Sequence, residues 1–192
     1  MLIKKIMEDA VKLLNLSAGE AETEEGETAP KEDIALTDGE KKLLLKCVDF
    51  VADDIASDYF PLVREDEMTA KNGRLFFKDF PRAPTAVASV RKNGKRVKFH
   101  RRFDGLKLDG DGKVIVQYAF KPAEATEDGE TEWADETVSE RILAYGVAAE
   151  YCIAAGLDAD AEMWDKRYRD ALQRAVIKFS SGKSTPPRRW FA

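Results

Sequence analysis

The spacing of the apolar residues changes twice along the chain, and this limits the folds that the chain can adopt. Residues 2–16 and 40–59 repeat apolar side chains every three or four positions, which is typical of amphipathic helices. Residues 72–122 alternate apolar and polar side chains, as half-buried strands do, and residues 138–180 return to the helical spacing. The pattern predicts an α+β fold, a helical bundle with a small antiparallel β module inserted into it.

Two helices are expected before the β module. The first, over residues 2–16, has an apolar stripe made of Ile3, Ile6, Met7, Val11 and Leu14. The second is preceded by Thr37, with Glu40 three residues later, which is the pattern of a capping box. It runs to about Tyr59 and ends near Phe60, because the residue before a proline avoids helical geometry.

An acidic segment separates these two helices. Ser17 to Asp33 holds seven acidic residues, one lysine and no aromatic residue, so it cannot bury enough apolar area to offset its chain entropy. We therefore predict a mobile linker over residues 17–36. The first helix is then tethered, and we expect it to dock only when the protein assembles. The alternative is that it folds back onto its own domain.

The β module is predicted as a compact antiparallel meander of five strands. The expected strands are Arg74–Phe80, Thr85–Lys92, Arg96–Arg101, Gly105–Leu108 and Lys113–Phe120. Asn93-Gly94 is a strong signal for a two-residue hairpin turn, and residues 109–112 form a second turn. The following stretch, residues 122–140, carries eight acidic residues and no basic one, and we interpret it as a solvated loop.

The C-terminal part is predicted to be a helical hairpin with a tail. The first helix ends at Gly156 and Asp158 caps the second, so the short connection makes the two helices antiparallel. The tail is expected to be extended and contains Pro186, Pro187, Arg188, Arg189, Trp190 and Phe191. The predicted organisation is an N-terminal helix at 1–16, a linker at 17–36, a helical domain at 37–62 and 134–181, a β module at 63–133 and a tail at 182–192.

The sequence offers no convincing catalytic or metal-binding pattern. Residues 179–185 resemble the end of a phosphate-binding loop, but a helix precedes them and two prolines follow. Residues 109–113 lack the later acidic ligands of a calcium loop, and His100 is the only histidine. Asp53 and Asp54 are adjacent on a helix and so point in different directions. We expect no enzyme activity, no metal and no cofactor, and we expect Cys47 and Cys152 to be buried reduced thiols rather than a disulfide or a reactive thiol.

Charge is distributed unevenly along the chain. The net charge of −5 argues against a dedicated nucleic-acid-binding protein, yet residues 91–102 contain seven Lys or Arg and no acidic residue. This basic hairpin is a solvated face, a partner for acidic surfaces, or a site for phosphate, with contacts from Arg91, Lys92, Lys95 and Arg96. The longest apolar stretch, residues 142–157, is shorter than the roughly 20 residues of a membrane span, and no signal peptide is apparent, so we expect no membrane association.

Several segments together resemble the head-to-tail adaptor (connector) proteins of tailed bacteriophages. They cover residues 37–192 in order and comprise Leu43–Val48, Asp58–Pro61, Val87–Lys95, Val114–Tyr118 with Pro122, Ala144–Cys152, Trp164–Tyr168 and Arg188–Trp190. The order of helix, β excursion, helical hairpin and basic aromatic tail carries the resemblance more than any single segment does.

The resemblance implies a structural role in the virion neck, at the head–tail junction, after assembly in the cytoplasm of the bacterial host. It implies a ring, typically a dodecamer, that binds the portal protein and a tail nozzle or head-closure protein and surrounds the DNA channel. We expect the tail residues 186–191 to bind the portal. We expect Tyr145, Ala148, Ala149, Trp164 and Tyr168 to pack between subunits. The alternative function is a nucleic-acid-binding module that uses the basic hairpin Arg91–Arg102.

Overall fold

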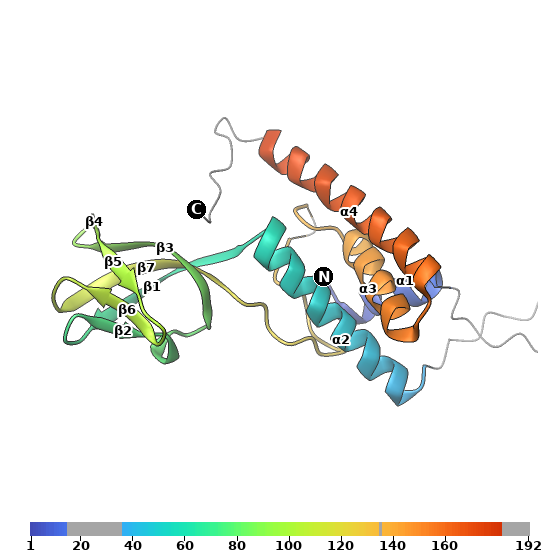
Figure 1. Ribbon diagram of the computed structural model, residues 1–192, viewed down its shortest axis with the longest axis horizontal. Coiled ribbons are helices and arrows are strands. Elements are labelled where there is room, and N and C mark those ends of the chain that lie inside the picture. Colours follow the sequence, from blue (N-terminus) through green and yellow to red (C-terminus); the bar gives the residue numbers. More distant parts are fainter. Residues whose placement is uncertain (15–35, 135, 182–192) are drawn as a thin grey trace, which may run out of the picture. The chain divides into compact units, whose positions relative to one another are not determined.

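The computed structural model describes residues 1–14, 36–134 and 136–181, and it has the mixed α+β composition that the sequence predicts (Figure 1). The chain divides into two compact units. The helical unit is formed by Met1–Ala52 and Glu124–Ser184, and the β unit includes Asp53–Ala123. These divisions fall earlier in the chain than the boundaries at 62/63 and 133/134 that the sequence suggested. Among the described helices, none is long and apolar enough to cross a membrane.

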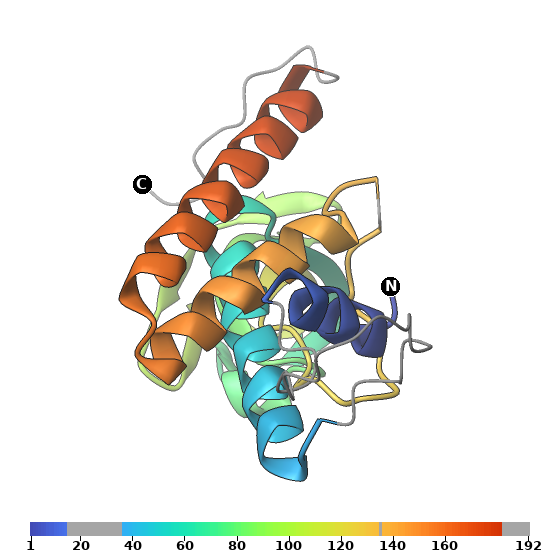
Figure 2. The same cartoon turned by 90° about the vertical axis from the view of Figure 1, so that its right-hand side faces the viewer.

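The helical unit is organised around α3. Its helices are α1 (Ile3–Leu13), α2 (Asp38–Asp54), α3 (Glu140–Ala155) and α4 (Asp158–Ser181), and α2 continues into a π-helical turn, η1 (Ile55–Tyr59). Helix α3 packs against both α1 and α4, as Figure 2 shows. It also meets α2, because a methyl group added at Gly146 would lie 2.8 Å from Cγ1 of Val51.

Helix α1 corrects one sequence expectation. It folds back onto α3 of the same chain, and Ile6 and Val11 are fully buried there. The first residue of the helix is also held, since the amide of Ile3 donates to the carbonyl of Gly129 at 3.0 Å. The apolar stripe of α1 is thus covered within one chain. The prediction that this helix docks only on assembly is wrong, and the alternative of folding back is correct. The predicted linker, apart from Leu36, lies outside the described residues.

Two helix ends that the sequence specified are present, whereas Asp158 is the first residue of α4 rather than its cap. The amide of Thr37 donates to Oε2 of Glu40 at 2.8 Å, and the amide of Glu40 donates to the Thr37 hydroxyl at 3.3 Å. This is the predicted capping box. At the end of α3, Gly156 adopts φ 72°, and the amide of Leu157 donates to the carbonyl of Cys152 at 2.8 Å. The left-handed glycine lets α4 begin directly and turn back along α3.

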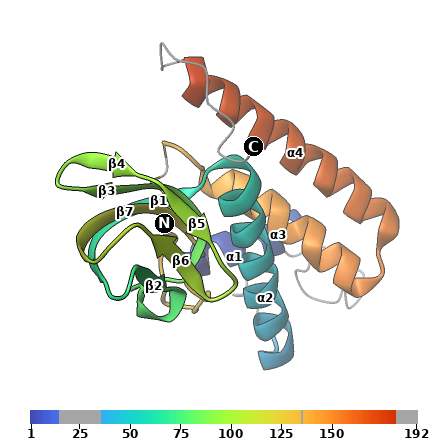
Figure 3. The same cartoon turned by 60° about the vertical axis from the view of Figure 1, so that its left-hand side comes forward.

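The β unit contains two antiparallel sheets (Figure 3). The four-stranded sheet has the order β1-β7-β3-β4, with β1 (Leu62–Ala70), β7 (Gly112–Phe120), β3 (Pro84–Lys92) and β4 (Lys95–Val97). The three-stranded sheet has the order β2-β6-β5, with β2 (Arg74–Phe76), β6 (Gly105–Leu108) and β5 (Phe99–Arg101). A 3-10 turn, η2 (Phe77–Asp79), follows β2. Asn93 and Gly94 both have positive φ at the β3–β4 turn, as the hairpin signal predicts.

The predicted five-strand meander is wrong in four respects. Strand β7 pairs with both β1 and β3, so distant segments form the centre of the sheet. The predicted strand Arg96–Arg101 divides at Lys98 between the two sheets, and the predicted strand Arg74–Phe80 is β2 followed by η2. Strand β1 was not predicted at all.

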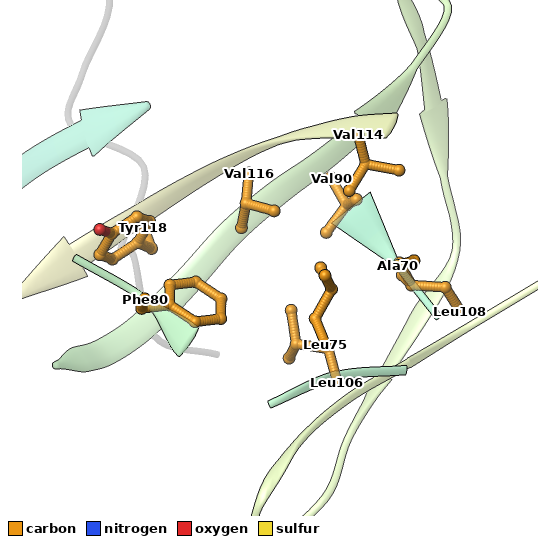
Figure 4. Close-up of a cluster of buried hydrophobic side chains, with 9 residues drawn as sticks. All are labelled: Ala70, Leu75, Phe80, Val90, Leu106, Leu108, Val114, Val116 and Tyr118. Carbon is orange, nitrogen blue, oxygen red and sulfur yellow. The ribbon is translucent and has the colours of Figure 1, made fainter. Parts of the chain in front are cut away.

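The two sheets enclose a small apolar core. Figure 4 shows Leu75 and Leu106 of the three-stranded sheet pointing toward Val90, Val114 and Val116 of the four-stranded sheet. The ring of Phe80 meets that of Tyr118 edge-on, with centroids 4.9 Å apart. The core therefore depends on residues from both sheets.

Candidate functional site

The described residues contain no group of three or more His, Cys, Asp or Glu side chains placed to hold a metal ion. His100 is exposed on β5. Asp53 forms an ion pair with Lys121, with Oδ2 and Nζ 2.7 Å apart. In the turn at residues 109–112, Oδ1 of Asp111 accepts a hydrogen bond from the amide of Gly73 at 2.6 Å, so this carboxylate holds two turns of the β unit together. Most of the phosphate-loop-like segment 179–185 lies outside the described residues.

The two cysteines are buried and unlinked, as expected. Burial, followed by the nearby charge of Glu150, raises the pKa of Cys47 to about 11. Burial, and then the charge of Asp160, also raises the pKa of Cys152. Reactive cysteines need an accessible thiolate, so both side chains act as small apolar core groups.

The five residues expected between subunits lie in the core of the helical unit. Tyr145 stacks on Trp164 with ring centroids 5.8 Å apart, and Tyr168 lies beside Gly146. All five side chains are buried, with exposed fractions between 0 and 9%; they are Tyr145, Ala148, Ala149, Trp164 and Tyr168. The small residues of α3 allow close helix packing, but the helices that approach belong to the same chain. Ala148 and Ala149 face the core of their own chain.

A different apolar surface is exposed where α3 turns into α4. We call it the turn patch, and it consists of Ile153, Leu157 and Met163, which are 59%, 46% and 40% exposed. Leu157 and Met163 also border a cavity of about 230 Å³ whose wall includes Leu13 of α1. The sequence does not reveal this surface, because Ile153 continues the apolar period of α3 after Ala149 and so indicates a buried position. The turn patch has the composition of a protein-contact surface and contains no catalytic group.

Strands β3 and β4 pair around the predicted Asn93-Gly94 turn of the basic hairpin, but residues 99–101 belong to β5 of the other sheet. Arg91 forms an ion pair with Glu65 of β1, and Nζ of Lys92 donates to the carbonyl of Asp111 at 2.6 Å. Lys95 and Arg96 are exposed on β4. Two of the four predicted contact residues thus hold the unit together, and the other two are available at its surface.

A second basic group was not predicted. Arg74, Lys107 and His100 occupy one level of the three-stranded sheet, because Lys107 is directly opposite Arg74 on one side and His100 on the other. All three side chains are exposed, and we call them the basic row. They come from three separate strands, so only the strand pairing brings them together. The one local signal was Lys107, the single polar residue in the strand Gly-Leu-Lys-Leu.

The predicted portal-binding residues 186–191 lie outside the described residues. No protein-family model matches the chain, and no curated protein matches it either.

Proposed function

We propose that this chain is a structural, non-enzymatic protein of the virion neck in tailed bacteriophages. It acts as a head-to-tail adaptor, forming a ring that joins the portal to the tail and continues the channel for the encapsidated DNA. The observation that carries the proposal is the order of the elements. Helix α2 leads into the β unit, the α3–α4 hairpin follows, and the sequence ends in a basic aromatic tail. This is the order by which the sequence resembles adaptor proteins.

The helical unit supplies the body of each subunit in this proposal. Its helices α1 and α4 pack on α3, and Tyr145, Trp164 and Tyr168 are buried in its interior. Contacts between copies must then use exposed residues. The turn patch supports this role, because three apolar side chains gathered at a helix connection favour burial against another protein.

The tail supplies the contact with the portal. Pro186 and Pro187 favour an extended chain, which reduces the entropy lost on binding. Arg189 and Trp190 are residue types that dominate interface energies, and Phe191 adds apolar area. The tail nozzle or head-closure protein binds on the opposite side of the ring.

The decisive experiment mixes the purified full chain with the portal protein of the same phage and images the mixture by negative stain. We expect rings seated on the portal. Deletion of residues 186–192 should abolish seating and leave the thermal unfolding transition of the chain in place. A chain that neither self-associates nor binds the portal at micromolar concentrations would overturn the proposal.

The subunit contact is tested separately by Ile153→Glu, which places a charge in the turn patch. Ring formation should fall by at least tenfold, because an unpaired charge buried in an interface costs several kcal/mol. The matched control is Ile115→Glu, at a residue of the β unit that is 40% exposed. It adds the same charge away from the patch and should leave assembly unchanged. Equal effects of the two substitutions would exclude the turn patch as the contact.

A further inference from the structure

The outer face of the three-stranded sheet has an unusual charge pattern. Its inward side chains, such as Leu75 and Leu106, are buried in the core of the β unit. The alternation along each strand therefore directs Arg74 and Lys107 outward. With His100 they form the basic row, which crosses all three strands at one level.

This arrangement is unfavourable within the chain. Arg74 and Lys107 are like charges directly opposite each other on neighbouring strands, and such a pair destabilises a sheet. The described residues provide no ion pair to any member of the basic row, although other cations of the β unit have one. Arg91 pairs with Glu65, and Lys113 pairs with Glu67 at 2.7 Å. The uncompensated repulsion is relieved when an anionic partner covers the face.

The charge balance of the unit agrees with such a partner. Residues 53–123 carry 15 Lys or Arg and 10 Asp or Glu, whereas the whole chain carries 31 and 36. The β unit is therefore net positive, although the whole chain is net negative. Two further like-charge pairings, Arg91 opposite Arg96 and Lys92 opposite Lys95, add to the positive potential at the β3–β4 hairpin.

Aromatic side chains beside these cations indicate the kind of anion. Phe76 is half-buried at the next outward position on β2, with Nζ of Lys78 at 5.6 Å from its ring centroid. Phe103 is fully exposed in the β5–β6 turn, next to Arg102. Cations with exposed aromatic rings are what single-stranded nucleic acid requires, since phosphates bind the cations and bases stack on the rings. An acidic peptide would need only the cations.

We propose that the outer face of the three-stranded sheet binds single-stranded nucleic acid, with the phosphodiester backbone on the basic row and bases against Phe76 and Phe103. This goes beyond the adaptor function and does not depend on it. The base sequence of the nucleic acid should have little effect on affinity, because neither the phosphate contacts nor the stacking contacts read base edges.

The test is fluorescence anisotropy of the full chain with a labelled oligothymidine of about 16 nucleotides, a length within the range that single binding modules cover. Affinity should fall steeply as salt rises from about 50 to 200 mM, because phosphate contacts release counterions. Lys107→Gln should weaken binding several-fold and reduce the slope of log Kd against log salt by about one. Lys113→Gln, the matched control in the same unit, should change neither.

Three outcomes would overturn the proposal. The first is no salt-dependent binding of the oligonucleotide. The second is an unchanged affinity and slope in Lys107→Gln. The third is binding of a synthetic acidic peptide of residues 17–33 in place of the oligonucleotide, which would assign the face to a neighbouring copy. Portal seating by Lys107→Gln should remain normal, so failure of this proposal and failure of the adaptor function give different results.

Discussion

The two units of the chain stabilise themselves in different ways. The helical unit has an interior of apolar and aromatic side chains, in which α3 approaches its neighbours closely through small residues such as Gly146. The β unit has a small apolar core extended by a polar group. The hydroxyl of Tyr118 donates to Oδ2 of Asp66 at 2.5 Å, and Nη2 of Arg64 donates to Oδ1 at 2.7 Å.

Because of this difference, the two units should respond to different kinds of substitution. The interior of the helical unit depends on packing, so volume changes should affect it most. The β unit has a half-buried carboxylate, Asp66, and a pair of like charges on its surface, so changes of pH and of charge should affect it most. Each prediction below tests one side of this contrast.

The largest expected effect is a cavity in the helical unit. Leu143 on α3 is fully buried, so Leu143→Ala should lower the free energy of unfolding by about 2–5 kcal/mol. Ile153→Ala, on the same helix but at a 59% exposed position, should change it by less than about 0.5 kcal/mol. Urea unfolding followed by circular dichroism measures both. Comparable losses would mean that Ile153 also lies in a packed environment.

The predictability of the two units from sequence also differs. In the helical unit the apolar period identified α2, α3 and α4, and the capping box and Gly156 fixed their ends, because helix signals are local. What the period could not reveal was whether a buried face meets the same chain or another copy. Tyr145 and Trp164 were therefore assigned to a subunit contact that the structure places in the core.

The β unit was harder for a physical reason. Strand β1 turns Arg64 and Asp66 toward Tyr118, so polar residues interrupt its alternation and the strand has no apolar signature. Asn72-Gly73, with φ of 53° and 64°, is the same turn signal as Asn93-Gly94 and would have indicated a strand before it. The basic row depends on strand order, which local patterns do not determine.

The next prediction concerns that polar group. Tyr118→Phe removes a donor from the Asp66 carboxylate, and hydrogen bonds to charged groups contribute about 1.5–3 kcal/mol. Burial raises the pKa of Asp66, but the hydrogen bonds from Arg64 and Tyr118 outweigh it and hold the pKa below its ordinary value of 3.8. A lowered folded-state pKa stabilises the fold above pH 4, and this stability is lost as pH falls through the folded-state pKa.

The loss of stability in Tyr118→Phe should therefore be full at pH 7 and shrink in acid. The dependence of stability on pH above 10 gives a second check. Burial, together with the Asp66 hydrogen bond and charge, raises the pKa of Tyr118 to about 12, so its contribution is present below pH 10 and is lost as pH rises toward 12. The matched control is Tyr145→Phe in the helical unit, because the Tyr145 hydroxyl accepts from Nε of Arg141 and does not donate to a carboxylate. A pH-independent difference at Tyr118 would contradict the assigned role of Asp66.

A glycine pair tests the close packing of α3. A methyl group added at Gly146 would lie 2.8 Å from Val51 and 3.0 Å from Tyr168, so Gly146→Ala should cost about 1–3 kcal/mol. Gly39, in the first turn of α2, has open space around it, and its nearest neighbour would be 4.0 Å away. Gly39→Ala should stabilise by up to about 1 kcal/mol through helix propensity. Thermal unfolding of the two variants should give shifts of opposite sign, and a shift of the same sign would mean that α3 has room for a side chain.

The smallest expected change in stability is that of Lys107→Glu, and its sign tests the argument for an anionic partner. Lys107→Glu reverses the charge at the centre of the basic row, so the repulsion between Lys107 and Arg74 becomes attraction. Cross-strand charge pairs contribute about 0.2–1 kcal/mol, and the variant should be more stable than the natural chain by an amount in that range. Lys113→Glu, which reverses the charge at an existing ion pair with Glu67, should be less stable. If the basic row is a binding surface, Lys107→Glu should gain stability and lose affinity for the oligonucleotide together. A destabilised Lys107→Glu would mean that the row is already compensated within the chain, and the argument for an anionic partner would fail.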